Sequence, residues 1–158
     1  MYKRAIVPLD GSPVAETILP FIHEIAGPLD MEVILLRVVQ PVPPVVIEGS
    51  RHVVVEDVEA RQTDAQEYLA SLAVELRNRG ARVETSVRRG DPPDEIIAGA
   101  RAAGADLIAM STHGRSGLGR LVFGSVAEAV LRQAGIPVFL LRATEADVRK
   151  RAAREAAR

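Results

Sequence analysis

The chain has 158 residues, and its 20 Lys and Arg side chains nearly balance 21 Asp and Glu side chains, giving a formal net charge of −1. This balance argues against nucleic acid or an anionic membrane as a partner, and the absence of cysteine excludes disulfides, thiolate catalysis and Cys-ligated metals. The length predicts one domain with an aliphatic core, and without a span-length apolar run or a signal-peptide pattern we expect a cytoplasmic protein.

The beginning of the chain predicts a strand, a helix and a second strand. Residues 3–9 (KRAIVPL) form a short apolar run that indicates the first strand. The pair Ser12-Pro13 starts a helix, because the hydroxyl can cap and proline suits the first turn. The apolar spacing predicts that this helix runs to Ile25 with a kink at Pro20. The run EVILLRVV, residues 32–39, is too apolar and too short for anything but a buried strand.

The middle of the chain holds an irregular segment and then the longest predicted helix. Residues 40–56 contain prolines and a Gly-Ser pair, so we predict an excursion without regular helix and with a candidate edge segment at 52–55. Residues 57–79 predict a helix that ends at Gly80. Its apolar stripe consists of Ala65, Leu69, Leu72 and Leu76.

The second half alternates between strands and helices. We predict, in chain order, a strand over 82–87, a helix over 91–103, a strand over 106–110, a helix over 126–133 and a strand over 137–141. Alternation of this kind requires a parallel sheet covered on both faces. We therefore predict an α/β fold, a single doubly wound domain with a five-stranded parallel sheet of order 3-2-1-4-5 and helices on both faces. This domain spans residues 1–142, and 143–158 form a charged C-terminal extension, either a solvated helix or a frayed tail.

The segment after the fourth predicted strand is rich in glycine (STHGRSGLGRLVFGSVAE, residues 111–128). Open α/β sheets bind ligands at the carboxyl ends of strands where the strand order reverses, which places this segment and Asp10 at the predicted site. Its glycines can turn successive backbone N–H groups toward an anion, and the helix after Gly124 adds its N-terminal dipole. The spacing from Gly119 to Ser125 is that of a P-loop without its lysine, so we exclude a P-loop NTPase.

Local structure alone can also explain several of these residues. Ser125 and Glu128 match a capping box, Asp10 suits an Asx-turn, and His113 is a typical solvated turn residue. Arg115 either faces a phosphate or only keeps the loop in water. The sequence leaves these alternatives open.

Three stretches resemble the nucleotide-binding branch of the universal stress protein family, within the adenine nucleotide α-hydrolase-like superfamily: AIVPLDGS, EVILLRVV and MSTHGRSGLGRLVFGSVAEAVLRQAGIPVFLLR. The family's phosphate motif is Gly, two residues, Gly, nine residues, then Gly with Ser or Thr. Here Gly114 and the pair Gly124-Ser125 match the motif, while Ser111 stands in place of its first glycine.

The resemblance implies an ATP site, with Mg²⁺ as a candidate companion of the phosphates. It assigns Asp10 to the ribose or adenine end, Pro8 and Leu9 to the base, and the backbone of Val38 to adenine. The residues that we expect to bind the nucleotide are Pro8, Leu9, Asp10, Val38, Ser111, His113, Gly114, Arg115, Ser116, Gly117, Gly124, Ser125 and Val126.

Two classes of function remain. We expect a regulatory ATP binder of the stress response, with at most slow hydrolysis. The alternative is an enzyme that hydrolyses or transfers a group from an adenine nucleotide, with Asp10 holding a metal, Arg115 neutralising charge and His113 acting as a remote base. The sequence shows no paired carboxylates, Ser-His-Asp set or HExxH pattern, which favours the binder.

The last predicted strand also predicts an assembly. Residues 137–141 form an apolar sheet edge, and such an edge invites pairing with another chain. We therefore expect a homodimer through this strand, and the family resemblance implies the same dimer. The sequence names no protein partner.

Overall fold

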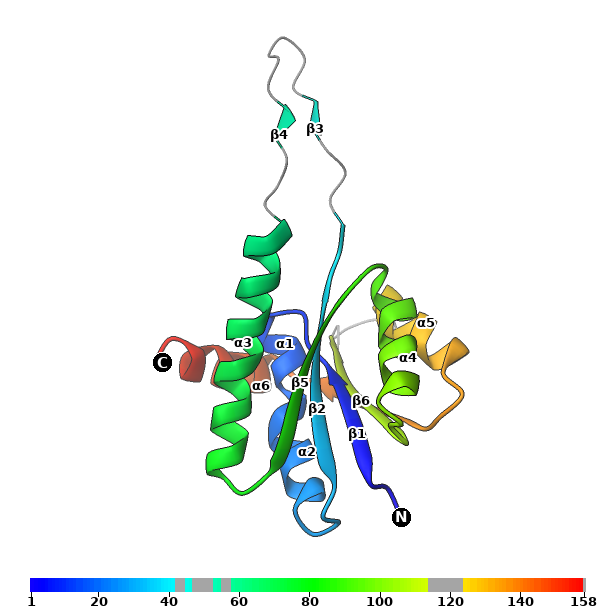
Figure 1. Ribbon diagram of the computed structural model, residues 1–158. Coiled ribbons are helices and arrows are strands. Elements are labelled where there is room, and N and C mark those ends of the chain that lie inside the picture. The colour runs from blue at the N-terminus through cyan, green and yellow to red at the C-terminus, as the bar shows by residue number, and fades with distance from the viewer. Residues whose placement is uncertain (42–44, 47–52, 55–57, 114–123, 158) are drawn as a thin grey trace.

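Five parallel strands form the central sheet of the protein (Figure 1). The structure is a computed structural model that describes residues 1–41, 45–46, 53–54, 58–113 and 124–157. The strands are β1 (Arg4–Pro8), β2 (Glu32–Val39), β5 (Arg82–Arg89), β6 (Leu107–His113) and β7 (Val138–Ala143). Their order in the sheet is β5-β2-β1-β6-β7, and every neighbouring pair is parallel. Numbered along the chain, these strands have the order 3-2-1-4-5, so the predicted fold is confirmed.

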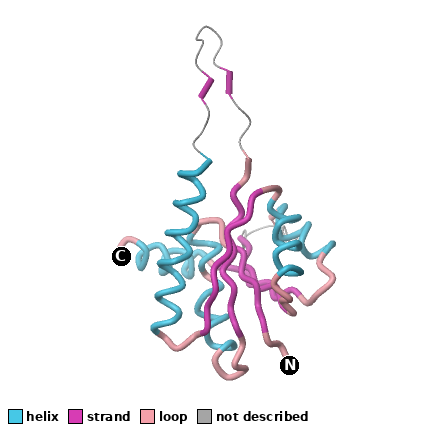
Figure 2. The backbone as a smooth tube through the Cα atoms, viewed as in Figure 1, coloured by secondary structure: helices cyan, strands magenta, loops and turns pink. Residues whose placement is uncertain are grey.

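Helices cover both faces of this sheet (Figure 2). Those in the described ranges are α1 (Pro13–Glu16), α2 (Ile18–Ala26), α3 (Val58–Asn78), α4 (Pro92–Ala102), α5 (Ser125–Gln133) and α6 (Glu145–Glu155). α1, α2 and α3 pack on one face, and α4 and α5 pack on the other. None of the helices in the described ranges has the length and apolar character needed to span a membrane.

Successive side chains of each strand point to opposite faces of the sheet and so build two cores. On β1, Ala5 and Val7 belong to the core under α2 and α3, whereas Ile6 belongs to the core under α4 and α5. Because both faces are covered, a strand such as β2 is almost continuously apolar. The helix α3 buries every member of its predicted stripe: Ala65, Leu69, Leu72 and Leu76.

The first helical segment is broken at a different residue from the one predicted. α1 ends at Glu16 and α2 begins at Ile18, so the break lies at Thr17 and not at Pro20. The proline still explains it, because proline has no N–H for the carbonyl of Glu16, four residues earlier, and its ring crowds that carbonyl. Pro20 then lies in the first turn of α2, where helix N–H groups have no intrahelical partner in any case.

The excursion over 40–56 is described only in part. β3 (Val45–Val46) and β4 (Val53–Val54) form a short antiparallel pair. β4 lies within the edge segment predicted at 52–55, whereas β3 has no counterpart in the prediction. The rest of the segment, 42–44, 47–52 and 55–57, lies outside the described residues.

β6 and β7 are both longer than their apolar runs predict. β6 continues over 111–113, and these residues pair with 141–143 of β7. The ladder between the two strands therefore carries β6 past the end of its apolar run at Met110. This extension places polar side chains on a strand, at the carboxyl edge of the sheet, where the sequence predicts a loop.

The C-terminal segment forms the helix α6, which packs against α1. Thr144 caps this helix, because its Oγ1 accepts a hydrogen bond from Asp147 N–H (3.2 Å) while Asp147 Oδ2 accepts one from Thr144 N–H (3.1 Å). Arg151 of the same helix is buried. The segment is therefore a helix and not a frayed tail, and Arg151 is the one buried residue of α6.

Candidate functional site

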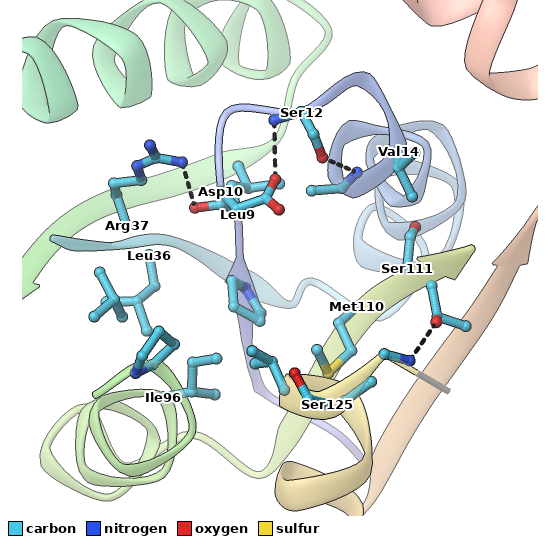
Figure 3. Close-up of a pocket in the computed structure, with 18 of the residues that line it drawn as sticks. Leu9, Asp10, Ser12, Val14, Leu36, Arg37, Ile96, Met110, Ser111 and Ser125 are labelled. Carbon is cyan, nitrogen blue, oxygen red and sulfur yellow. Dashed lines mark hydrogen bonds between the residues drawn. The ribbon is translucent and has the colours of Figure 1, made fainter. Parts of the chain in front are cut away.

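A cleft of about 560 Å³ opens at the carboxyl edge of the sheet, beside the ends of β1 and β6 (Figure 3). The strand order reverses between these two strands. All of the predicted site residues that are described line this cleft: Pro8, Leu9, Asp10, Val38, Ser111, His113, Gly124, Ser125 and Val126. The remaining predicted residues lie outside the described part of the chain: Gly114, Arg115, Ser116 and Gly117.

The turn between β1 and α1 is built by Asp10, Gly11 and Ser12. Ser12 N–H donates to Asp10 Oδ1 (2.9 Å), and Ser12 Oγ accepts from Ala15 N–H (3.2 Å) at the start of α1. Gly11 has a φ of +87°, and a side chain there would begin 3.1 Å from Arg37 Nη1, so the turn favours glycine. The Asx-turn alternative for Asp10 is thus confirmed. The second carboxylate oxygen of Asp10 makes no hydrogen bond to a described residue and remains open to a ligand in the cleft.

Ser111 stands at the position of the first glycine of the family's phosphate motif, and its hydroxyl is hydrogen-bonded within the protein. Its Oγ lies 2.9 Å from Thr17 Oγ1, and Thr17 Oγ1 donates to Val14 O (2.6 Å). Since a hydroxyl has one hydrogen to donate, Ser111 is the donor to Thr17. Thr17 is buried at the break between α1 and α2. The serine therefore lines the cleft while its hydroxyl hydrogen is directed to Thr17.

The helix α5 begins at the cleft without a side-chain cap. Gly124 is its N-cap residue, and Gly124 O accepts a hydrogen bond from Glu128 N–H (2.9 Å). The capping-box alternative is therefore wrong, because Ser125 is already the first residue of the helix and the Glu128 side chain pairs with Arg132. The start of α5 brings its first backbone N–H groups, the Ser125 hydroxyl and the positive end of the helix dipole to the cleft.

Thr112 is a cleft residue that the sequence pattern does not reveal. Its Oγ1 accepts a hydrogen bond from Gly124 N–H (3.3 Å), which connects the start of α5 to β6. The prediction ends this strand at Met110 and treats Thr112 as part of a loop. Only the pairing with β7 shows that the threonine belongs to the sheet.

Arg37 of β2 is a second unpredicted residue of the cleft. Its Nη1 lies 3.4 Å from Leu9 O (Figure 3). Its guanidinium carbon lies 5.6 Å from the centre of the Tyr68 ring on α3. The Tyr68 hydroxyl donates in turn to Glu16 Oε1 of α1 (2.9 Å). The only signal in the sequence is a basic side chain inside the apolar run EVILLRVV. Arg37 places a positive charge beside the turn that holds Asp10.

The rest of the cleft wall is largely apolar. β2, α4, β6 and α5 contribute side chains to it, including Leu36, Pro92, Ile96, Met110 and Ala127. Asp10 is the one carboxylate among the described residues that line the cleft. Within the described ranges, no three His, Asp or Glu side chains gather as a metal site. A cleft that combines an apolar wall with several polar side chains suits a ligand that joins an apolar ring to an anion.

The contact between Tyr68 and Glu16 predicts a response to high pH. Burial, and after it the neighbouring Glu16 carboxylate, raises the pKa of Tyr68 above its ordinary value of 10.0. The unfolded chain loses the proton of the Tyr68 hydroxyl near pH 10, whereas the folded protein keeps it. The stability that this contact contributes is therefore present below about pH 10 and is lost as the pH rises further. In a Tyr2→Phe variant, Tyr68 is the one remaining tyrosine, and we expect tyrosinate absorbance to appear only when the protein unfolds in alkali.

Circular dichroism of the same samples shows at which pH the protein unfolds. Tyrosinate absorbance near pH 10 in a protein that is still folded would contradict the buried contact between Tyr68 and Glu16.

Known proteins share both the sequence pattern and the fold. Residues 1–142 match the model of the Universal stress protein family. Universal stress protein MJ0531 of Methanocaldococcus jannaschii is 34% identical over 144 residues, which cover 90% of this chain and 83% of that protein. The solved structure of MJ0577, from the same organism, matches with a TM-score of 0.71 and 29% identity, and the match covers 92% of this chain and 99% of that one. A universal stress protein of Archaeoglobus fulgidus, solved in complex with dAMP, matches with a TM-score of 0.63 and 25% identity over 89% of this chain and 98% of that one.

Proposed function

Because this chain belongs to the universal stress protein family, we propose that its cleft binds an adenine nucleotide, ATP with Mg²⁺, and that the protein is a regulatory nucleotide binder of the stress response. The observation that carries this proposal is the cleft at the reversal of strand order, lined by every described residue that we expected to bind the nucleotide. The A. fulgidus relative solved with dAMP supports an adenine nucleotide as the ligand. We propose that residues 1–142 carry this function and that the protein acts in the cytoplasm.

The phosphates belong at the start of α5 in this proposal. The first N–H groups of a helix have no intrahelical partner, and the helix dipole favours a negative charge beside them. Gly124 is exposed, and Ser125 adds a hydroxyl next to those N–H groups. Gly114, as the family's phosphate motif implies, and Gly117, through the freedom of its backbone, would supply further N–H groups from the preceding segment.

The nucleoside belongs at the end of β1. Pro8 and Leu9 would contact the adenine ring, and Val38 would offer it backbone groups. Asp10 has a carboxylate oxygen that can accept a hydrogen bond from a ribose hydroxyl. Mg²⁺ usually keeps several waters and binds through phosphates with one or two carboxylates, so Asp10 is also the residue that would meet the ion.

The described lining favours a binder over an enzyme. Phosphoryl transfer needs an oriented nucleophile and neutralisation of charge at the reacting phosphate. Asp10 is the single carboxylate among the described lining residues, and Asp10 Oδ1 already holds the turn into α1. His113 lines the cleft and is exposed, without a described carboxylate that orients it. We therefore propose at most slow hydrolysis.

The experiment that tests this function uses the protein as purified. Denaturing it and identifying the released small molecules by mass spectrometry should yield an adenine nucleotide. Protein loaded with ATP and Mg²⁺ should then release ADP only slowly. Release of a guanine nucleotide, or of none even after incubation with ATP, would contradict the proposal.

We further propose that the protein forms a homodimer through β7. This strand lies at the edge of the sheet, and its Phe139 is 39% exposed. Replacing Phe139 with aspartate should yield monomers in sedimentation velocity, because the change removes apolar contact and places like charges at a paired edge. Leu131→Asp is the matched control, since this leucine on α5 is also 39% exposed and is not on the edge strand. A parent protein that sediments as a monomer at micromolar concentration would refute the dimer.

A further inference from the structure

A buried ionic cluster joins the C-terminal helix to the body of the protein. Arg151 of α6 is 4% exposed and Glu16 of α1 is 0% exposed. Arg151 Nε lies 2.5 Å from Glu16 Oε2, and the two Nη atoms of Arg151 lie 3.1 and 3.2 Å from the carboxylate oxygens of Glu75 on α3. Burial alone lowers the pKa of Arg151, and the hydrogen bonds to Glu75 and Glu16 outweigh it, so the guanidinium stays charged. α6 lies beyond residues 1–142, so the family match does not account for this cluster.

The same cluster continues to the cleft. Glu16 binds Arg151 through Oε2 and accepts the Tyr68 hydroxyl through Oε1. The Tyr68 ring lies against the guanidinium of Arg37, and Arg37 reaches Leu9 O at the end of β1. The contacts therefore run without interruption from α6, through α1 and α3, to a lining residue of the cleft.

Arg37 depends on these contacts for its position. An arginine side chain has many rotamers, and fixing it has an entropic cost that its contacts must offset. Its bond to Leu9 O is long, at 3.4 Å, so the Tyr68 ring is a substantial part of its support. Tyr68 in turn is oriented by a carboxylate that has no contact with water. Without Arg151, the buried Glu16 carboxylate would keep only the hydrogen bond from the Tyr68 hydroxyl. Its side chain would then rearrange toward water or another cation.

We propose that Arg151 is a positioning residue of the nucleotide site, which holds Arg37 at the cleft through Glu16 and Tyr68. The inference rests on the proposed nucleotide binding and adds its regulation: docking of α6 and binding of the nucleotide favour each other. A positive charge held beside the β1–α1 turn, at the nucleoside end, offsets the charge of Asp10 and so makes the cleft less repulsive to an anionic nucleotide. Coupling of this kind is reciprocal, so the nucleotide stabilises the docked α6 by the same factor by which α6 strengthens binding.

The test compares ATP affinities of variants by titration calorimetry. Arg151→Met should weaken ATP binding by about fivefold or more, within the usual range of coupling between sites. Arg151→Lys should recover part of the loss, because it restores a positive charge toward Glu16. Arg149→Met is the matched control: it removes the same side chain from an exposed position of the same helix and should leave affinity unchanged.

Two further variants separate positioning from a general loss of structure. Tyr68→Phe keeps the ring under Arg37 and removes only the hydroxyl that meets Glu16, so it should weaken ATP binding even if Arg151→Met does not fold. In an Arg37→Met background, Arg151→Met and Tyr68→Phe should cause no additional loss, because the group that they position is absent.

The outcomes distinguish this inference from the function on which it rests. A parent that binds no ATP overturns both. A parent that binds ATP, with Tyr68→Phe and every folded Arg151 variant binding equally well, overturns the inference alone. If Arg151→Met and Tyr68→Phe weakened ATP binding by the same factor in the parent and in the Arg37→Met background, the inference would also be overturned. The effect would then not pass through Arg37.

Discussion

Replacing Arg151 with methionine is expected to lower the free energy of unfolding by about 3–5 kcal/mol, the usual cost of removing one partner of a buried ion pair. Glu16 is 0% exposed and would keep only the Tyr68 hydroxyl, while Glu75 would lose both hydrogen bonds from the guanidinium. Domains of this size have total stabilities of about 5–15 kcal/mol, so the variant should fold but unfold at a much lower urea concentration. Urea unfolding followed by circular dichroism measures the change.

Two comparisons show whether burial causes this effect. Arg132→Met removes an ion pair with Glu128 whose arginine side chain is 75% exposed, and it should change stability by no more than about 0.5 kcal/mol. The double variant Glu16→Gln with Arg151→Met removes both charges and should recover part of the loss. If Arg151→Met and Arg132→Met had the same small effect, the buried cluster would contribute little to stability.

Replacing Gly124 with valine is expected to abolish nucleotide binding while the protein stays folded. The Gly124 φ of −59° is ordinary for any residue, and a Cβ there would meet no described atom within 4 Å. The fold therefore tolerates a side chain, at about 1 kcal/mol for losing a favourable N-cap residue. In the cleft, however, valine would keep a phosphate from the first N–H groups of α5. Losing two charge-assisted hydrogen bonds of about 1.5–3 kcal/mol each weakens affinity by about a hundredfold or more.

Gly135→Val is the matched control for this substitution. Gly135 is exposed, and a Cβ there also meets no described atom within 4 Å, but the residue does not line the cleft. It should bind ATP like the parent. If Gly124→Val bound ATP as tightly as Gly135→Val, the phosphates would not lie at the start of α5.

The sequence predicts the fold well because each strand and helix is encoded locally. The run EVILLRVV is a buried strand with the predicted bounds, and the alternation of elements along the chain predicts the parallel sheet. The errors arise where a neighbouring strand, or a residue further along the same helix, decides where an element ends. β6 is extended by pairing with β7, and the helix break moves to Thr17 because proline acts on the carbonyl four residues earlier.

The site is predicted less completely for the same reason. Asp10 is visible because it lies beside Gly11 at the end of the first strand, and Gly124 because it closes the glycine-rich segment that follows the fourth predicted strand; ligands of α/β proteins bind at such strand ends. Arg37 of β2 and Tyr68 of α3 can be recognised as important only from their contact in the folded protein. No periodicity in the sequence connects the two residues. The capping box of Ser125 is a local pattern that fails, because the helix begins one residue earlier than such a cap requires.

Titration of ATP with Mg²⁺ into the parent protein tests the central claim most directly. The account predicts saturable heat with one nucleotide per chain, weaker binding of GTP, and a midpoint of thermal unfolding that rises with ATP concentration as binding to the folded state requires. Neither heat nor a thermal shift at millimolar ATP would contradict nucleotide binding by this cleft.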